Sequence, residues 1–253
     1  MGMVLDKTIL VTGGASGIGQ ATAILLAAEG ARVVIADLSL DAGNKTVEKI
    51  VRAGGQAEAH KVDVSDHTQM SALVEAIADR YGSLDGAFNN AGVPGPVANV
   101  CKLTMDDWDE VIKINLTGVF ASIKCEVAQM VKQVRGGSIV NTASVCGLVG
   151  MYGQAAYNAS KHGVVGITRT VALEYARKNI RVNSVCPGFI ETPMLKVRTD
   201  ADPTLSAYLD NSVPLGRKAQ PLEIAEAAMW LLSDRSSYVT GIAMPVDGGF
   251  TAV

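Results

Sequence analysis

Short runs of β-branched and apolar residues alternate along the chain with longer segments whose apolar residues recur at helical spacing. The first run, residues 7–12, is followed by a helical segment that ends at Gly30, and the alternation continues towards the C-terminus. Helix starts are marked by a Thr104–Asp107 capping box and by Pro221 at the first position of a helix. The pattern predicts seven strands, at about residues 7–12, 31–37, 57–64, 84–90, 136–144, 180–188 and 241–249.

Strands and helices that alternate in this way favour a parallel sheet covered by helices on both faces. The predicted strands are nearly continuous apolar runs, which is typical of strands buried on both sides. No internal repeat, linker or low-complexity tract interrupts the pattern. We therefore expect residues 1–253 to form a single α/β domain, a Rossmann-type doubly wound parallel sheet of about seven strands.

The composition argues against several functional classes. The 253 residues carry a formal net charge of −3, and without a basic stripe we expect no nucleic-acid partner. The most apolar stretch is too short to cross a membrane, and the N-terminus lacks the apolar region of a signal peptide, so we expect no membrane association. Metal-ligand or CxxC spacing is lacking among the cysteines, which predicts no metal site and reduced thiols at Cys101, Cys125, Cys146 and Cys186, and hence a reducing, cytoplasmic setting.

A glycine-rich stretch, TGGASGIG, lies between the first strand and its helix. Gly13, Gly17 and Gly19 permit a tight turn there, and they let backbone N–H groups approach a pyrophosphate at the helix N-terminus. The spacing G-x-x-x-G-x-G differs from the G-x-G-x-x-G dinucleotide fingerprint. A glycine-rich turn that binds no ligand is the alternative interpretation.

The second strand ends in Asp37, eighteen residues after Gly19, which is near the distance at which an acid hydrogen-bonds the adenosine ribose. A carboxylate there would repel a 2′-phosphate by roughly 4 kcal/mol at a separation of about 4 Å. Neither the glycine-rich stretch nor Leu38 and Ser39 supply an Arg or Lys to offset the repulsion. Asp37 therefore favours NAD over NADP, with a plain helix cap as the alternative.

Tyr157 and Lys161 stand four positions apart, which places both side chains on one helix face. An isolated phenol has a pKa of about 10, too high for proton transfer near neutrality. An ammonium group about 4 Å away would favour the phenolate by roughly 4 kcal/mol, or about three pKa units, and an oxidised nicotinamide would act in the same direction. We interpret the pair as an acid–base group, with accidental surface neighbours as the alternative.

Taken together, TGGASGIG, NNAG at 89–92, Asn115, Ser144, YNASK and Pro187-Gly188 resemble the short-chain dehydrogenase/reductase family, in family order over nearly the whole chain. The resemblance implies a Rossmann-type domain, a homotetramer and a catalytic tetrad of Asn115, Ser144, Tyr157 and Lys161. It also implies a set of cofactor-binding residues: Gly13, Ser16, Gly17, Ile18, Gly19, Asp37, Leu38, Asp63, Val64, Asn90, Ala91, Gly92, Tyr157, Lys161, Pro187, Gly188, Ile190 and Thr192.

Specific roles follow from the resemblance. Asp63 and Val64 would contact adenine, Asn90 would lie near the ribose, and Ile190 with Thr192 would hold the nicotinamide carboxamide. Ser144 would hydrogen-bond the substrate oxygen as its charge develops. The fourth member of the tetrad, Asn115, would hold a water that links Lys161 to solvent.

These residues predict an NAD(H)-dependent oxidoreductase that interconverts a secondary alcohol and a ketone by hydride transfer, with Tyr157 as acid and base. Residues 189–213 are expected to form a lid that selects the substrate, with a fixed packing helix as the alternative. A mostly apolar wall would favour a small to medium substrate; its candidates are Val93, Val145, Leu148, Met151 and Tyr152. The competing functions are a 3-oxoacyl-thioester (acyl-carrier) reductase and a non-catalytic NAD-sensing binding protein.

Overall fold

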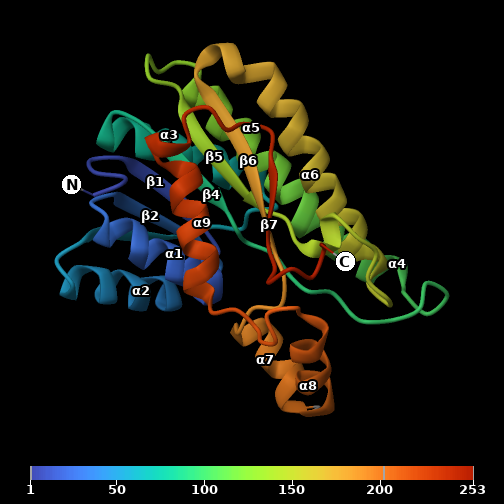
Figure 1. The fold of residues 1–253 in the computed structure, drawn as a ribbon. Coiled ribbons are helices and arrows are strands. Elements are labelled where there is room, and N and C mark those ends of the chain that lie inside the picture. Colours follow the sequence, from blue (N-terminus) through green and yellow to red (C-terminus); the bar gives the residue numbers. More distant parts are fainter. Residues whose placement is uncertain (1, 202, 253) are drawn as a thin grey trace.

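The computed structural model describes residues 2–201 and 203–252, which form a seven-stranded sheet flanked by helices (Figure 1). All strand pairs are parallel, and the strand order is β3-β2-β1-β4-β5-β6-β7. The strands are β1 (Thr8–Thr12), β2 (Arg32–Asp37), β3 (Gln56–Lys61), β4 (Gly86–Asn89), β5 (Gly137–Thr142), β6 (Ile180–Pro187) and β7 (Ala243–Val246). The predicted doubly wound α/β fold is confirmed.

Helices connect the strands and cover both faces of the sheet. The α-helices of the described residues are α1 (Gly17–Ala28), α2 (Leu40–Arg52), α3 (His67–Tyr81), α4 (Met105–Ile112), α5 (Gly118–Met130), α6 (Ala155–Tyr175), α7 (Pro193–Ala201), α8 (Pro203–Ser212) and α9 (Pro221–Leu232). The predicted capping box of Thr104 and Asp107 opens α4, and Pro221 is the first residue of α9. Both helix starts are therefore confirmed.

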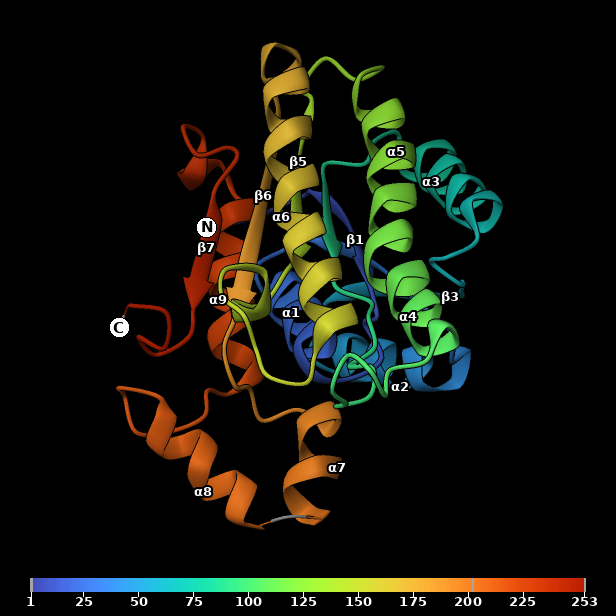
Figure 2. The ribbon, with the colours of Figure 1, turned by 90° about the vertical axis from the view of Figure 1, so that its right-hand side faces the viewer.

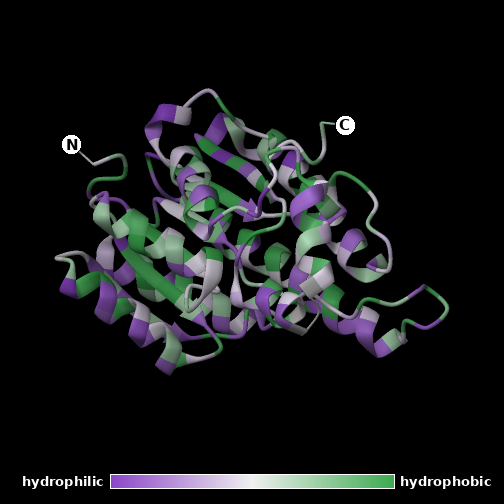
Figure 3. Ribbon diagram, turned by 60° about the horizontal axis from the view of Figure 1, so that its bottom comes forward, coloured by the Kyte–Doolittle hydropathy of each residue, from purple (hydrophilic) through white to green (hydrophobic). Residues whose placement is uncertain are grey.

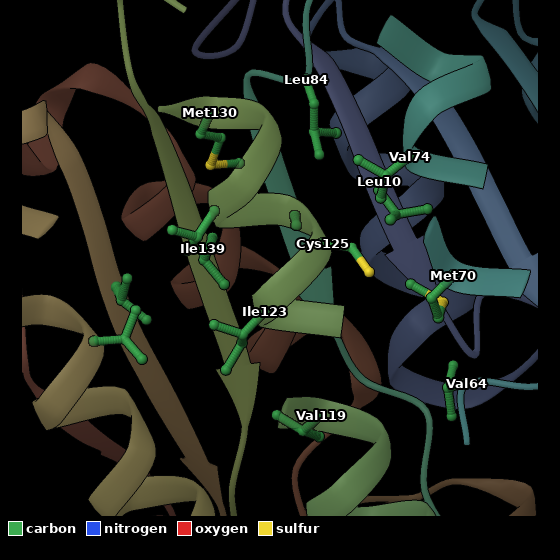
Figure 4. Packing of buried hydrophobic residues seen from close by; sticks show 14 of the residues in the cluster. Leu10, Val64, Met70, Val74, Leu84, Val119, Ile123, Cys125, Met130 and Ile139 are labelled. Carbon is green, nitrogen blue, oxygen red and sulfur yellow. The ribbon is translucent and has the colours of Figure 1, made fainter. Parts of the chain in front are cut away.

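The alternation of side chains along β1 divides the interior into two hydrophobic clusters. Leu10 packs on one face with residues of α3, α5 and α6, whereas Ile9 and Val11 pack on the other face with residues of α1, α2 and α9. Figure 2 shows α5 and α6 lying over the first face, and Figure 4 shows Ile123 and Met130 of α5 beside Ile139 of β5. Burying each large aliphatic side chain contributes about 1.5–3 kcal/mol, so both helix layers are stabilised by packing on the sheet.

The edge strand β3 departs from the predicted apolar character and length. Its six residues are half-buried or exposed, because an edge strand has a neighbour on one side only. The prediction extended this strand to Val64, but pairing stops where Val62 N–H donates to the carbonyl of Asp37. In Figure 3 the central strands are largely hydrophobic, whereas the helices carry both kinds of residue.

The chain leaves β1 towards one edge of the sheet and returns at β4 towards the other edge, so β1 and β4 flank the topological switch point. Ligands of such sheets bind beyond the carboxyl ends of the strands at this point. Helices α7 and α8 follow β6 and lie beyond the same end of the sheet (Figure 1). Within the described residues, no helix is both long enough and apolar enough to cross a membrane.

Candidate active site

A cavity of about 790 Å³ opens at the carboxyl ends of the strands. Its walls come from the segments after β1, β2, β3, β4, β5 and β6, from the start of α6, and from α7 and α8. All but two of the residues predicted to bind cofactor or to catalyse line this one cavity; the two exceptions are Gly19 and Asn115. The predicted residues therefore lie together in the fold, while their roles in binding and catalysis stay predictions.

The glycine-rich stretch forms a cradle at the N-terminus of α1. Gly13 and Gly17 adopt positive φ values of 64° and 54°, which residues other than glycine rarely adopt. Ser16 is the N-cap residue, but its side chain makes no capping hydrogen bond. Free N–H groups of the first turn and the positive end of the helix dipole therefore face the cavity, an arrangement that fits a pyrophosphate.

Gly19 serves this cradle without lining it. A Cβ atom at Gly19 would overlap the main-chain oxygen of Gly13 and would lie 2.6 Å from Nδ2 of Asn90. Asn90 in turn donates from Nδ2 to the carbonyls of Thr12 and Gly13, at 3.2 and 3.3 Å. Gly19 therefore allows close packing between α1 and the loop, and its direct contact with a cofactor stays a prediction.

Asp37 joins the cradle to the end of β2. Its Oδ2 accepts a hydrogen bond from the N–H of Ala15 at 3.1 Å, and Oδ1 accepts from the N–H of Ser39 at 3.0 Å. Ser39, rather than Asp37, is the N-cap of α2, because its side chain accepts from the N–H of Ala42. The helix-cap alternative for Asp37 is therefore wrong, and the carboxylate lines the cavity beside Leu38.

The residues predicted to contact the adenine and ribose lie on the same wall. Asp63 turns the chain after β3, where its Oδ1 accepts from both the N–H and the hydroxyl of Ser65 at 2.8 and 2.7 Å. Val64 lines the cavity beside it. Ala91 lies close to the cradle, since a Cβ at Gly13 would be only 2.9 Å from the Cα of Ala91.

Tyr157 and Lys161 lie on the first turns of α6, as predicted. The side chain of Lys161 is almost completely buried, and its Nζ donates to the carbonyl oxygen of Thr142 at 2.7 Å. The same Nζ lies 5.5 Å from the centre of the Tyr157 ring. The ammonium group is therefore tied to the last residue of β5 and sits beside the phenol ring.

Ser144 reaches this pair from the segment after β5. It precedes a 3₁₀ turn, Val145–Gly147, and its Oγ accepts from the N–H of Cys146 at 3.2 Å. Ser144 is buried, lines the cavity, and hydrogen-bonds Tyr157 in a way that lowers the pKa of the phenol. The structure thus brings Ser144, Tyr157 and Lys161 together.

Burial of Tyr157 opposes the acidity expected of its phenol. Burial raises the pKa of this phenol above its ordinary value, and the opposing hydrogen bond from Ser144 does not offset it. Burial also lowers the pKa of Lys161 to about 8. The protein's own charges therefore leave the phenol protonated at neutral pH.

Asn115 lies behind the cavity wall in a π-helical turn, Lys113–Thr117, between α4 and α5. Its completely buried amide pairs with the main chain of Val93: Oδ1 accepts from the N–H and Nδ2 donates to the carbonyl, both at 2.8 Å. A Cβ at Gly92 would be 3.0 Å from Asn115 Oδ1 and 3.8 Å from Lys161 Nζ. Asn115 anchors the wall beside Lys161, and its role in a water relay stays a prediction.

The segment predicted as a lid forms α7 and α8, and both helices line the cavity. Before them, Ile190 pairs with Ala219, and Thr192 lies close to the cradle, since a Cβ at Gly17 would be 3.3 Å from its Cγ2. Lys218 holds α8 through an ion pair with Asp210 at 2.8 Å. Pro187 and Gly188 line the cavity beside this segment.

The predicted wall is largely correct, with one exception. Val93, Val145, Met151 and Tyr152 line the cavity, whereas Leu148 packs against the hydrophobic cluster under α6. Several lining side chains were not predicted: Pro94, Val97, Glu110, Lys113, Gln154 and Phe250. Closeness in sequence is the signal that would have found one of them, because Gln154 stands three positions before Tyr157, at the N-cap of the same helix.

Below the site lies a buried polar network, which the sequence analysis did not anticipate. Asn89 Nδ2 donates to Glu126 Oε2 and to Asn141 Oδ1, both at 3.0 Å, and Asn141 donates to Thr168 at 2.9 Å. Glu126 Oε1 and Asn89 Oδ1 have no hydrogen-bond partner among the described residues. Burial raises the pKa of Glu126 to about 8, so the carboxyl holds its proton at neutral pH.

Comparison with known proteins decides the family. A family model described as enoyl-(acyl carrier protein) reductase matches residues 13–251. The chain is 44% identical over 247 residues to the 2,5-dichloro-2,5-cyclohexadiene-1,4-diol dehydrogenase of Sphingobium indicum, covering 98% of each chain. The chain belongs to the short-chain dehydrogenase/reductase family. It is therefore an oxidoreductase of that family.

Other members of the short-chain dehydrogenase/reductase family are similar to this chain in sequence or in structure. The cyclohexanol dehydrogenase of Acinetobacter sp. is 44% identical over 98% of this chain and 96% of its own, and the 3-oxoacyl-[acyl-carrier-protein] reductase of Thermotoga maritima is 44% identical over 96% and 97%. The structure of levodione reductase superposes with a TM-score of 0.95 at 39% identity, covering 98% and 99%.

Two further structures bear on the coenzyme of the family. Carveol dehydrogenase from Mycobacterium avium, in complex with NAD, has a TM-score of 0.95 at 31% identity and covers both chains completely. A putative 2-deoxy-d-gluconate 3-dehydrogenase from Agrobacterium tumefaciens, with bound NADP, has a TM-score of 0.90 at 35% identity over 99% and 98%. The family likeness supports a nicotinamide coenzyme without choosing between the two.

Proposed function

We propose that this oxidoreductase uses NAD(H) to interconvert a secondary alcohol and its ketone on small to medium, mostly apolar substrates. Relatives named as cyclohexanol dehydrogenase, levodione reductase and a cyclohexadienediol dehydrogenase support this reaction. The observation that carries the proposal is the meeting of Ser144, Tyr157 and Lys161 in one cavity with the uncapped N-terminus of α1. These groups would hold a substrate oxygen, a proton and a pyrophosphate within one site.

The residues of the chain have distinct tasks in this reaction. When bound, the nicotinamide supplies or accepts the hydride. Ser144 hydrogen-bonds the substrate oxygen, and Tyr157 donates a proton to that oxygen in reduction and accepts it in oxidation. Lys161 places its ammonium group beside the phenol ring, where a positive charge favours the phenolate. Asn115 holds the wall at Val93 in place.

Asp37 supports NAD rather than NADP. Its carboxylate lies at the end of β2 and on the cavity wall, and it is held by the N–H groups of Ala15 and Ser39. A 2′-phosphate at this carboxylate would be repelled by several kcal/mol. Asp37→Ala should therefore raise the ratio of NADPH-dependent to NADH-dependent kcat/KM at least tenfold. An unchanged ratio would mean that Asp37 does not distinguish a ribose 2′-hydroxyl from a 2′-phosphate.

The reaction is tested by following NADH absorbance with a panel of cyclic and acyclic ketones. Wild-type protein should oxidise NADH with at least one simple ketone, and Tyr157→Phe should lower kcat at least about a thousandfold. Fluorescence titration should show that the variant still binds NADH. Turnover by Tyr157→Phe at the wild-type rate would contradict the acid–base assignment.

A 3-oxoacyl-thioester reductase is the second candidate, supported by the Thermotoga maritima relative and by the description of the family model. Acetoacetyl-thioester in the same panel separates the two functions, since this candidate requires it to be reduced faster than the simple ketones. A non-catalytic NAD-binding protein would turn over neither class. The assembled Ser144, Tyr157 and Lys161 argue against it.

We also propose that the protein forms a homotetramer in the cytoplasm. Large apolar side chains are exposed on the outer helices, including Phe120 on α5 and Leu173 on α6, at 50% and 84% of their surface. The four cysteines are free thiols, which suits a reducing compartment. Sedimentation analysis at micromolar concentration tests the assembly, and a monomer would contradict it.

A further inference from the structure

The wall around the reacting groups contains a polar side chain for which the reaction itself has no task. Residues 145–154 and the helices α7 and α8 give this wall Val145, Met151 and Leu209, all apolar. Among its polar members, Ser212 donates its hydroxyl to the carbonyl of Leu209 at 2.8 Å. Gln154 is half-buried and presents a carboxamide, the group that hydrogen-bonds hydroxyl and carbonyl oxygens.

The oxygen of the Gln154 carboxamide already accepts a hydrogen bond from within the protein. The thiol of Cys146 lies 3.9 Å from Gln154 Oε1 and donates towards it. Burial raises the pKa of the Cys146 thiol, so the sulfur keeps the proton that this contact needs. The Nε2 group of Gln154 donates to no atom of residues 2–201 or 203–252, and its two N–H donors remain for a ligand.

The position of Gln154 places this donor close to the reacting groups. Gln154 is the N-cap residue of α6, three residues before Tyr157, and both residues line the same cavity. Its partner Cys146 donates from its N–H to Ser144 Oγ at 3.2 Å. Gln154 therefore borders the space in which the substrate ring must lie when its reacting oxygen meets Ser144.

We propose that Gln154 binds a second oxygen of the substrate, so that the preferred substrates are cyclic ketones and alcohols carrying a further carbonyl or hydroxyl group on the same ring. This inference rests on the proposed alcohol–ketone reaction and names its substrate class. The apolar wall binds the ring, Ser144 and Tyr157 take the reacting oxygen, and Gln154 donates to the other oxygen. A ring without that oxygen would cover the half-buried amide donor without pairing it, which costs binding free energy.

The test compares three ketones of one ring size: cyclohexanone, 2-hydroxycyclohexanone and cyclohexane-1,4-dione. For each, kcat/KM is measured with NADH for wild type, Gln154→Met and Gln154→Glu. Wild type should favour at least one of the doubly oxygenated ketones over cyclohexanone by about tenfold, the effect of one neutral hydrogen bond. Gln154→Met has similar length without a donor and should abolish this preference, mainly through KM.

Gln154→Glu keeps the size of the side chain and the oxygen that faces Cys146, but it offers a carboxylate to the substrate. It should lower the preference for the dione, whose carbonyl oxygens only accept hydrogen bonds. Gln56→Met, the same change at the exposed start of β3, is the matched control and should leave every ratio unchanged. Thermal melting of each variant confirms folding.

The outcomes separate this inference from the proposed function. If wild type reduces cyclohexanone but none of the doubly oxygenated ketones is favoured, or if the preference persists in Gln154→Met and Gln154→Glu, the role of Gln154 is wrong and the proposed function stands. If wild type reduces no ketone of the set or of the wider panel with either coenzyme, the proposed function itself fails.

Discussion

Glu126→Gln should change how the free energy of unfolding depends on pH. Glu126 is completely buried on α5, and Oε2 accepts from Asn89 at 3.0 Å. Because burial raises the pKa of this carboxyl from 4.5 to about 8, the native protein holds a proton that the unfolded chain releases near pH 4.5. Gln has nearly the same shape, carries no charge at any pH, and keeps an oxygen for Asn89.

The magnitude follows from the width of the pH interval. Between pH 4.5 and about 8 the native state binds about one proton more than the unfolded state, so stability falls as pH rises by about 1.4 kcal/mol per pH unit. The contribution is fully present below pH 4.5 and is lost as pH rises to about 8. Over this interval the wild type should lose about 5 kcal/mol that Glu126→Gln does not lose.

Urea unfolding at pH 5.5, 6.5 and 7.5 measures this difference, at one protein concentration because assembly would shift the midpoint. The stability of Glu126→Gln relative to wild type should increase steadily from pH 5.5 to pH 7.5. Two proteins with parallel pH curves would refute the reasoning, because Glu126 would then titrate alike in both states. A variant that is less stable by the same amount at each pH would refute it too.

Three further predictions concern packing, the lid and the acid–base pair. Gly19→Ala should destabilise the protein by about 2 kcal/mol or more in urea unfolding, because its Cβ would overlap the main-chain oxygen of Gly13. Asp210→Asn should speed amide hydrogen exchange in α8 about tenfold, since it breaks the ion pair with Lys218. For ketone reduction, kcat/KM should fall above about pH 8, where Lys161 loses its charge, and Lys161→Arg, although slower, should lack this fall.

Each of these predictions has a matched control or a contradicting outcome. Gly166→Ala places a methyl group in open space on α6 and should stabilise the protein by about 0.5–1 kcal/mol. Glu48→Gln removes one charge from the exposed pair with Arg52 and should leave exchange in α8 unchanged. An alkaline fall in activity that persists unaltered in Lys161→Arg would show that another group titrates.

The fold could be predicted because its signals are local. The strand runs, the Thr104–Asp107 capping box and Pro221 each specify one element, and alternating elements leave few arrangements other than a parallel doubly wound sheet. The end of β3 could not be located this way, because Val62 and Val64 are as apolar as strand residues. Their place is decided by Asp63, which binds Ser65 and turns the chain into the cavity.

Site residues were predictable from the sequence where the chemistry requires one residue type. They were less predictable where tertiary packing decides the burial or the direction of a side chain. Gly13, Asp37 and Lys161 occupy the places that their chemistry suggested. Burial of Tyr157 was not visible in the sequence, and it raises the pKa of the phenol. Likewise, Asn115 turned out to face Val93, because the π-helical turn sets its direction.

The contact that holds the Lys161 ammonium has a consequence for sequence variation. Nζ donates to a peptide carbonyl, at Thr142, and every amino acid supplies that oxygen. A point mutation at position 142 therefore cannot remove this hydrogen-bond acceptor. It could do so if Lys161 were paired with the carboxylate of a side chain. Natural drift at the end of β5 can reshape the neighbouring wall while the cation stays anchored, which gives the scaffold room to acquire new specificities.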